Sequence, residues 1–416
     1  VRRAAWFAAV ALLLNANCGE ERVVYGPDPF ARDPAGVGPL AGKILTSNSG
    51  DDSLSVLDPA TPGPAGRIVV GFNPVELENP HHLAADPAGR YIYGNLTLAG
   101  VGAGLGPHGM HGASTQAGFV VKLDAATGRE IARVKVDANP GDSTLSADGR
   151  TLYVTHYDES AWRAHGRSSN LVIVDTERMV VRARVPLCPA AHGVRVTADG
   201  TMLYATCGPD QLAVVELASG TFPVRWVGVP GGGPEDAPAC ARCPYALALA
   251  PDGTVWLSAL GPNSGSAGGR GSVEIFDPQR EGGSFDPVRR IPLRGRPVFA
   301  SFVADAATGG YRVLVPEQIG PGDAVWIYSS GALGEAPQRL GGIELDPRQC
   351  LNAHMILVEP DQRGQLICEG DQRGPGSFVW FNLATGAVLG AVPIGVFPDG
   401  MVLVPPPLAP PVTITP

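Results

Sequence analysis

Histidine is the residue type in this sequence whose spacing points most directly to chemistry. A neutral imidazole nitrogen is a ligand for copper, zinc, iron or nickel, and it exchanges protons near neutral pH. Of the eight histidines, one group stands at the start of short apolar segments that end in tight turns: His81, His82, His192 and His354. The others occur in longer polar or glycine-rich stretches: His108, His111, His156 and His165.

The position of these residues relative to the turns predicts a common site. Counted back from the turn that follows, His81, His192 and His354 hold the same place in three apolar segments. In two further segments the same place is held by Tyr245 and Asp399. We expect these two residues and the three histidines to line the mouth of one channel. Imidazoles gathered there could hold copper or another transition metal, with more candidate ligands in His82, His108 and His111. Alternatively, the histidines line a water-filled channel and no cofactor is required.

The cysteines indicate an oxidising compartment. With Cys18 set aside, six of the seven cysteines remain, an even number that suits disulfide pairing. Cys188 precedes one apolar segment and Cys207 ends the next, and Cys350 and Cys368 hold the same two places elsewhere. If successive segments are antiparallel neighbours, each pair lies within bonding range, so we predict two disulfides.

The remaining pair, Cys240 and Cys243, forms a Cys-x-x-Cys motif followed by Pro244. A c-type haem requires histidine directly after the second cysteine, and a thioredoxin-like motif opens a helix, which a segment starting at this proline does not. One such motif supplies only half of a structural zinc site. We predict a local disulfide, with a metal-binding or partner-binding thiol pair as the alternative.

Other motifs support no assignment of catalytic residues. The loop Gly104–Gly112 contains a literal Gly-x-Gly-x-x-Gly, but no helical pattern follows, so a dinucleotide site is not expected. We expect a glycine-rich surface loop there, unless its His108, Met110 and His111 bind copper. The sequence lacks a Gly-x-Ser-x-Gly elbow, a Walker A motif, a His-Glu-x-x-His motif and an EF-hand loop.

The elements that position these residues are strands in a four-strand repeat. The clearest copies are LSADGRTLYVTHY…NLVIVD and VTADGTMLYATCG…QLAVVEL, each an apolar strand, an Asp-Gly turn, a second strand and two more. Four strands at a period of roughly 40–60 residues are typical of a propeller blade. The third strand is found seven times, beginning at Ser53, Phe119, Leu171, Leu212, Ser272, Ala324 and Phe378. The sequence predicts an all-β fold, a single seven-bladed β-propeller of four-stranded antiparallel blades.

The two ends of the repeat region predict how the ring closes. Met401–Val404 is a first strand without a second, whereas Lys43–Ser47 is a second strand without a first. Pairing them completes one blade shared by the N- and C-terminal segments and removes the exposed sheet edges. In such a disc, the starts of first strands and the long insertions lie on one face, where all eight histidines are expected. Loops on a rigid scaffold commonly bind ligands.

The N-terminal segment predicts export. Arg2 and Arg3 precede the apolar run Ala4–Leu14, which is too short to span a bilayer, and Cys18 follows. We interpret residues 1–17 as a signal peptide, 18–40 as a flexible tether, 41–405 as the propeller and 406–416 as a proline-rich tail. Lipidation of Cys18 would anchor the protein in the bacterial cell envelope, in the periplasm or on the outer surface. The alternative is an ordinary secretory signal.

The repeats also resemble a known family. The segments LSADGRTLYVTHY, VTADGTMLYATCG and LAADPAGRYIYGN resemble the YVTN-type β-propeller repeats of bacterial surface and periplasmic proteins, and the resemblance covers most of the region from Lys43 to Val404. It implies a propeller fold, in a family that includes binding proteins, lactonase-like enzymes and haem-domain relatives. The stretch NPHHLAADPAGRYIYGN resembles the paired-histidine strands that help hold copper in nitrous oxide reductase.

Three functions therefore remain open. The first is an exported, lipid-anchored propeller that binds a ligand or protein partner on its histidine-lined, loop-rich face. The second is a copper-type metal-binding protein or metal-dependent enzyme with its site at the channel mouth, and the third is a lactonase-like hydrolase. The net charge of −9 argues against nucleic acid as a partner. We expect a monomer that contacts membrane only through its lipid anchor.

Overall fold

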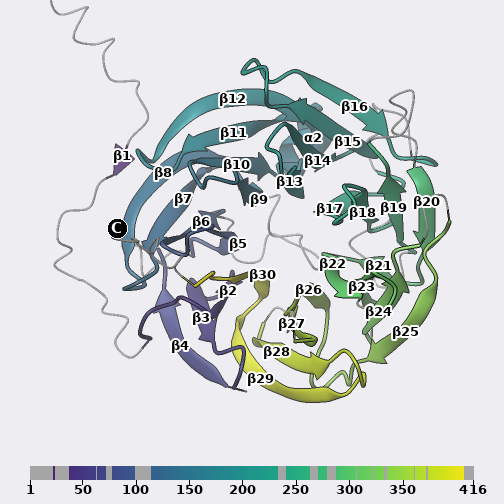
Figure 1. Ribbon diagram of the computed structural model, residues 1–416. Helices are drawn as coiled ribbons and strands as arrows, with labels where there is room; N and C mark the ends of the chain where they lie inside the picture. Colours follow the sequence, from purple (N-terminus) through teal and green to yellow (C-terminus); the bar gives the residue numbers. More distant parts are fainter. Residues whose placement is uncertain are drawn as a thin grey trace, which may run out of the picture.

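Seven antiparallel sheets surround a central axis in the computed structural model of the chain (Figure 1). The structure describes residues 22–23, 37–61, 63–71, 77–98, 114–232, 240–262, 270–278, 287–305, 307–320, 322–331, 335–359, 361–371 and 373–406. Each sheet is one blade, so the prediction of an all-β, seven-bladed propeller is confirmed. Residues 1–17, Cys18 and most of the predicted tether lie outside the described residues, as do residues 407–416 of the tail.

Strands succeed one another from the axis outward in every blade. Blades 1 to 3 are formed by β30 (Pro398–Leu403), β2 (Ile44–Asn48), β3 (Ser53–Leu57) and β4 (Pro64–Val69); by β5 (Pro80–Ala85), β6 (Tyr91–Leu96), β7 (Ala117–Asp124) and β8 (Glu130–Ala138); and by β9 (Pro140–Leu145), β10 (Thr151–His156), β11 (Ser169–Asp175) and β12 (Val180–Cys188). A short strand, β1 (Arg22–Val23), extends the outer edge of blade 2 by pairing with β8.

The remaining blades repeat this order, with one departure in blade 6. Blades 4, 5 and 7 are β13 (Val194–Val196), β14 (Met202–Cys207), β15 (Gln211–Glu216) and β16 (Val224–Gly228); β17 (Pro244–Leu249), β18 (Val255–Ala259), β19 (Ser272–Phe276) and β20 (Pro287–Pro292); and β26 (Ala353–Val358), β27 (Arg363–Cys368), β28 (Pro375–Asn382) and β29 (Val388–Val396). In blade 6 the innermost strand is divided into β21 (Arg296–Pro297) and β22 (Ser301–Asp305), followed by β23 (Gly310–Gln318), β24 (Ala324–Ser329) and β25 (Arg339–Glu344).

Blade 1 closes the ring with strands from both ends of the propeller sequence. β30 pairs antiparallel with β2, and the register runs from Ile44 opposite Leu403 to Asn48 opposite Pro398. The predicted sharing of one blade between the N- and C-terminal segments is therefore confirmed. Because strands from the two ends of the propeller sequence are hydrogen-bonded into one sheet, the ring cannot open without breaking that ladder.

Short polar residues set the turns between first and second strands. In the β9–β10 turn, Asp148 accepts hydrogen bonds from the Ser146 hydroxyl and the Arg150 backbone N–H, at 2.6 and 3.0 Å. Gly149 there has a φ of 70°, a left-handed conformation that favours glycine. An aspartate three residues before the start of the second strand, followed by glycine, thus encodes the tight turn and sets the strand pairing.

Apolar side chains from adjacent blades form the core between the sheets. Between blades 2 and 3, Val120, Val134, Leu152 and Val172 are completely buried in one cluster. Burying a valine or leucine side chain contributes about 1.5–3 kcal/mol, so each such layer joins neighbouring blades firmly. The inner strands are thereby held at fixed positions around the axis, which makes them a rigid frame for a site.

Disulfides join consecutive blades where the sequence predicted them. Cys188 at the end of β12 bonds Cys207 at the end of β14, and Cys350, which precedes β26, bonds Cys368 at the end of β27. Both predicted disulfides are confirmed. In each case the bond links the chain entering a blade to the second strand of that blade.

Helix α2 (Glu159–His165) interrupts the connection between β10 and β11, where the sequence had indicated only a loop. Asp158 caps its N-terminus by accepting a hydrogen bond from the Ala161 N–H, and Gly166 ends it in a left-handed conformation. Trp162 is buried and packs the helix onto the propeller. No helix among the described residues has the length and apolar character needed to cross a membrane.

Candidate functional site

Four candidate histidines meet on the propeller axis. His81 and His82 lie on β5, His192 directly precedes β13, and His354 lies on β26. The ring centroid of His82 lies 4.2 Å from that of His81, 5.2 Å from that of His192 and 6.4 Å from that of His354. His81 and His192 are 5.4 Å apart. All four residues are at most 1% exposed.

The inner strands bring these residues together because they start at corresponding positions around the axis (Figure 1). The second residue of the inner strand is His81 in blade 2, Tyr245 in blade 5, His354 in blade 7 and Asp399 in blade 1. Their side chains and that of His192 form a closely packed layer, which we call the upper layer. The five residues that the sequence placed at one position relative to the following turn thus form one layer of side chains across the channel.

Two glycines allow the inner strands to approach this closely. A Cβ atom added at Gly400 would lie 2.5 Å from the His81 carbonyl oxygen, and one at Gly193 would lie 2.9 Å from backbone atoms of Tyr245 and Ala246. Both distances are too short for a real contact, so a larger residue would push apart the strands that carry the histidines. The absence of a side chain at these positions is therefore a condition for the cluster.

Backbone carbonyls orient two of the imidazoles. The Nδ1 atom of His81 lies 3.3 Å from the Pro140 oxygen, and that of His192 lies 3.2 Å from the Tyr245 oxygen. A carbonyl oxygen can only accept, so in each bond Nδ1–H donates, and in the neutral form of the ring the lone pair is on Nε2. This is the arrangement by which proteins fix the tautomer of a metal-binding histidine.

His82 is held neutral in the same environment. Burial, reinforced by the neighbouring imidazoles and Arg195, lowers the pKa of His82 well below its usual range. Its Nδ1 atom lies 3.9 Å from Asp142 Oδ1, and no described residue makes a hydrogen bond to Nε2. A buried nitrogen with a lone pair and no partner is unfavourable in a protein interior, and a bound cation would satisfy it.

Three of these residues form a group with the spacing of a metal site. One ligand atom from each of His81, His82 and His192 lies within 4.8 Å of the other two. In a tetrahedral zinc site with Zn–N bonds of about 2.0–2.1 Å, the nitrogens are about 3.4 Å apart. The three rings therefore need to draw together by no more than about 1.5 Å to coordinate one ion. Three neutral imidazoles suit copper or zinc.

Buried carboxylates surround the imidazoles. His354 Nδ1 lies 2.6 Å from Glu369 Oε1, and His81 Nε2 lies 3.8 Å from Asp399 Oδ2. Asp399 also accepts hydrogen bonds from Ser49 at 2.5 Å and Ser47 at 3.2 Å. Burial raises the pKa of Asp399, while the adjacent His81 and the serine hydroxyls act in the opposite direction. Negative charge at these positions would favour a cation on the axis.

Aromatic rings close the site against solvent. Tyr245 stacks on His192 with ring centroids 3.9 Å apart, and Tyr157 meets the same imidazole edge-on at 5.3 Å. Phe299 lies 5.0 Å from His82 and 5.6 Å from His354. Burial raises the pKa of both tyrosines, which keeps their phenol groups neutral. The surroundings are therefore of low polarity, in which a charge–charge interaction is strong.

A cavity of about 410 Å³ reaches His82. Its inner end is formed by His82, Asp142, Arg195 and Phe299, and its walls extend to Pro87 and Ser146–Ala147 in turns between first and second strands. These turns lie on the face opposite the long insertions. The sequence had indicated access from the loop-rich face, whereas this cavity approaches from the tight-turn face.

Several residues of the site were not anticipated. Asp142 is the third residue of β9, the place that His82 holds in β5, and Met355 holds it in β26. Phe299 lies beside Met355 through a parallel bridge, and Glu369 follows β27. The side chains of His82, Asp142 and Met355 at this third position line the cavity together with Arg195 and Phe299, and we call these five residues the lower layer. Aligning the third as well as the second residue of each inner strand would have identified Asp142.

Other predicted candidates lie elsewhere. His108 and His111 lie outside the described residues. His156 is the last residue of β10 rather than part of the following loop, and its Nδ1 atom lies 3.0 Å from the Asn170 oxygen. His165 ends helix α2 and is exposed. The structure therefore groups His81, His82, His192 and His354. His156 and His165 lie apart from this group.

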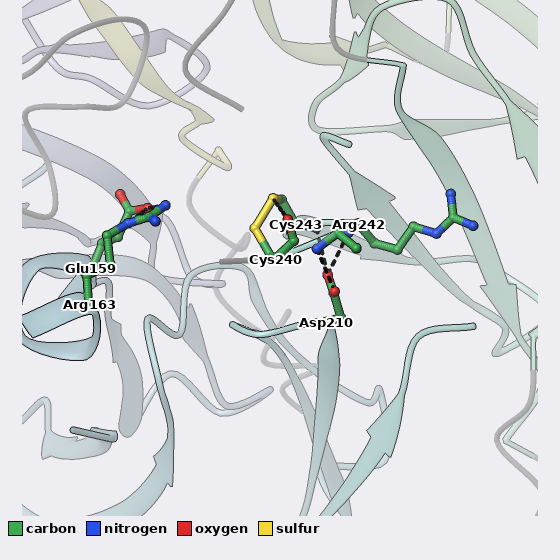
Figure 2. Close-up of a disulfide and its surroundings, with 7 residues drawn as sticks. Glu159, Arg163, Asp210, Cys240, Arg242 and Cys243 are labelled. Carbon is green, nitrogen blue, oxygen red and sulfur yellow. Dashed lines mark hydrogen bonds and ion pairs between the residues drawn. A yellow bond between two sulfur atoms is a disulfide. The ribbon is translucent and has the colours of Figure 1, made fainter. Parts of the chain in front are cut away.

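The Cys-x-x-Cys motif forms the predicted local disulfide, and Figure 2 shows its surroundings. The Asp210 carboxylate accepts hydrogen bonds from the backbone N–H groups of Ala241, Arg242 and Cys243, at 2.7 to 2.9 Å. Asp210 thus fixes the loop that leads into β17. In this form the two sulfurs are bonded to each other, so no thiolate is offered to a metal.

Comparisons with known proteins establish the fold and no activity. No protein-family model matches the chain, and no curated protein matches it. Membership of the YVTN-type family therefore stays a prediction. Many solved structures are similar, among them a protein of unknown function from Desulfotomaculum acetoxidans, with a TM-score of 0.61 and 11% identity, covering 88% of this chain and 100% of that one.

Two enzymes are also similar in structure. The periplasmic gluconolactonase PpgL of Pseudomonas aeruginosa has a TM-score of 0.58 and 17% identity, covering 87% of this chain and 98% of that one. The dihydro-heme d1 dehydrogenase NirN has a TM-score of 0.55 and 17% identity, and the match covers 97% of this chain and 86% of that one. At such identity the likeness defines the class of fold, a seven-bladed propeller, because one fold hosts many activities.

Proposed function

We propose that this protein is a metal-binding β-propeller that holds one transition-metal ion on its axis. The observation that supports the proposal is the group of buried donor atoms from His81, His82 and His192, all within 4.8 Å of one another. Copper and zinc are the ions that such imidazole nitrogens favour. This is the second of the functions that the sequence left open, and the burial of the imidazoles favours it over partner binding on an open, histidine-lined face.

The residues have distinct roles in this proposal. His81, His82 and His192 are the ligands, and the carbonyls of Pro140 and Tyr245 fix the rings of the first and third. Asp399, close to His81, contributes negative charge that compensates the ion. Because the blades are rigid, the donors are brought together before binding, and little conformational entropy is lost when the ion enters.

Metal titration of untagged protein tests the proposal. Protein stripped with a chelator and then dialysed against Cu²⁺ or Zn²⁺ should retain one ion per chain by elemental analysis. His82→Ala and His192→Ala should each weaken binding by at least about 100-fold, about 2.7 kcal/mol. His165→Ala, on the exposed end of helix α2, is the matched control and should bind as the parent does. Retention of less than 0.1 ion per chain, or unchanged binding in both variants, would refute the proposal.

We also propose export and lipid anchoring through Cys18. Three disulfides among the described residues support an oxidising compartment, since such bonds are rare in the cytosol. Expression of the full chain in a bacterial host should yield a membrane-bound protein whose N-terminal peptide carries lipid on Cys18 by mass spectrometry. Cys18→Ala should release the protein from the membrane fraction. An unmodified N-terminal peptide in the mature protein would contradict lipidation.

A further inference from the structure

The axial cavity has the size and the mixed lining of a small-molecule site. Its volume of about 410 Å³ lies within the range of roughly 300–1,000 Å³ that is usual for ligand pockets. It ends at His82, so a molecule within it would reach the proposed metal ion. Nothing in the proposed function requires such a cavity, because a purely structural ion needs only its ligands.

Arg195 gives one wall of the cavity a cationic group with unused donors. Its side chain is 28% exposed, and both of its hydrogen bonds leave from Nη1, to Asp142 Oδ2 and to the Val194 oxygen. The Nε and Nη2 atoms carry three more N–H bonds, and no acceptor in the described part of the chain reaches them. An edge of a guanidinium with two donor nitrogens matches a carboxylate, which it can bind through two parallel hydrogen bonds.

Asp142 does not cancel this preference for an anion. Its carboxylate already accepts hydrogen bonds from the backbone N–H groups of Ser143 and Val194, at 2.8 and 3.2 Å, and from Arg195. The Asp142–Arg195 pair joins one carboxylate to one guanidinium, so it is close to neutral overall. A divalent ion on the axis would therefore add positive charge at the inner end of the cavity, part of which Asp399 offsets.

Apolar side chains form another part of the lining. Phe299, Met355, Met401 and Leu83 line the cavity, and the Arg195 guanidinium lies 5.7 Å from the Phe299 ring centroid. Thioether side chains adapt to ligands of different outline, while an aromatic ring provides a flat surface. A ligand that fits both parts of the lining has one anionic head and a compact apolar body.

We infer that the axial cavity binds a small organic anion, a monocarboxylate with a compact apolar body, whose head lies between the Arg195 guanidinium and the ion on His82. The contact with the ion rests on the proposed function, whereas the contact with Arg195 does not. The anion enters from the tight-turn face. The site thus combines an ion that can accept a carboxylate oxygen as a ligand with an arginine that orients the same group.

Benzoate and benzamide form a matched pair of probes, since they differ mainly in the charge of the head. By calorimetry on the zinc-loaded protein, benzoate should bind at least about 10-fold more tightly than benzamide. Arg195→Gln should abolish that difference, while Arg348→Gln, whose side chain is 88% exposed, should preserve it. Ala248→Phe, which fills the cavity without changing its charge, should weaken both probes. Elemental analysis of every sample reports the metal content separately.

The outcomes separate the two proposals. A metal-loaded, folded protein that binds neither probe, or binds benzoate equally well with Arg195→Gln, overturns the inference and leaves the metal site standing. Benzoate binding that depends on Arg195 in a protein that retains no metal supports the anion site and refutes the proposed function. Arg195→Lys keeps a positive charge beside Asp142 and therefore controls for misfolding of Arg195→Gln. This variant should retain part of the preference for benzoate.

Discussion

The upper and lower layers of the channel share two inner strands, with His81 beside His82 in β5 and His354 beside Met355 in β26, yet their surroundings differ. In the upper layer His81, His192 and His354 are completely buried, and each has a partner at Nδ1. In the lower layer Asp142 and Arg195 line a cavity of about 410 Å³. The strand pairing is irregular between Pro80 and Leu83 in β5 and between Ala353 and Ile356 in β26, so one strand can serve both layers. A rigidly held side chain and one that faces the cavity can therefore be neighbours in the sequence.

Breaking the buried pair in the upper layer should have the largest effect on stability. His354→Ala removes the imidazole from beside the completely buried Glu369. The cavity left by the ring and the loss of a partner for a buried carboxyl group together cost about 3–5 kcal/mol. Denaturant unfolding should show this loss, whereas Lys43→Ala, from a half-exposed pair with Asp58, should cost no more than about 1 kcal/mol. Equal losses in the two variants would show that the upper layer is not specially sensitive.

A buried imidazole outside both layers provides a reference for pH dependence. Burial lowers the pKa of His156 from 6.5 to about 4. Between these values the unfolded chain binds a proton that the folded protein excludes, so stability falls as the pH drops from 6.5 to 4 and levels off below. The loss from this residue is about 3 kcal/mol. His156→Gln should remove that part of the pH dependence in unfolding measurements, and an unchanged profile would contradict it.

Metal binding should stabilise the fold, because His81 and His192 of the upper layer and His82 of the lower layer would share one ion. An ion at 100 times its dissociation constant contributes about 2.7 kcal/mol to the free energy of unfolding. Thermal unfolding of the parent should move upward with added Zn²⁺, and His82→Ala should abolish the shift. A shift of equal size in that variant would place the stabilising ion elsewhere.

The smallest expected effect concerns the aromatic wall of the lower layer. Phe299 lies 5.0 Å from His82 and 5.6 Å from His354 in edge-on contacts. Phe299→Leu keeps most of the apolar volume and loses these ring contacts, which together contribute about 1 kcal/mol. Denaturant unfolding measures the difference, and metal content should not change. A loss above about 3 kcal/mol would mean that the lower layer is packed as rigidly as the upper one.

The sequence was informative wherever a local pattern repeats. The third strands, the Asp-Gly turns and the pairing of β30 with β2 were predicted because alternation and turn chemistry act over a few residues. The disulfides followed from the positions of cysteines in that register. Helix α2 was missed because a seven-residue helix depends on its Asp158 cap and on the burial of Trp162, and its sequence pattern is short.

The site was anticipated only in part. Counting residues back from each turn placed His81, His192 and His354 in one register, since each belongs to the start of an inner strand. Arg195 carries no such signal, because its role depends on Asp142 of the neighbouring blade. The cavity could not be foreseen either, since it arises from the distances between inner strands of different blades.

By itself the sequence determined the number of blades, the strand order and the residues that occupy each register position, because hydrophobic alternation and turn residues act locally. Only the tertiary structure decided which of those positions is buried, which faces the cavity and from which face the cavity is reached. The physical reason is that the blades meet through packing between residues far apart in the chain. Whether neighbouring imidazoles are near enough to share an ion depends on that packing.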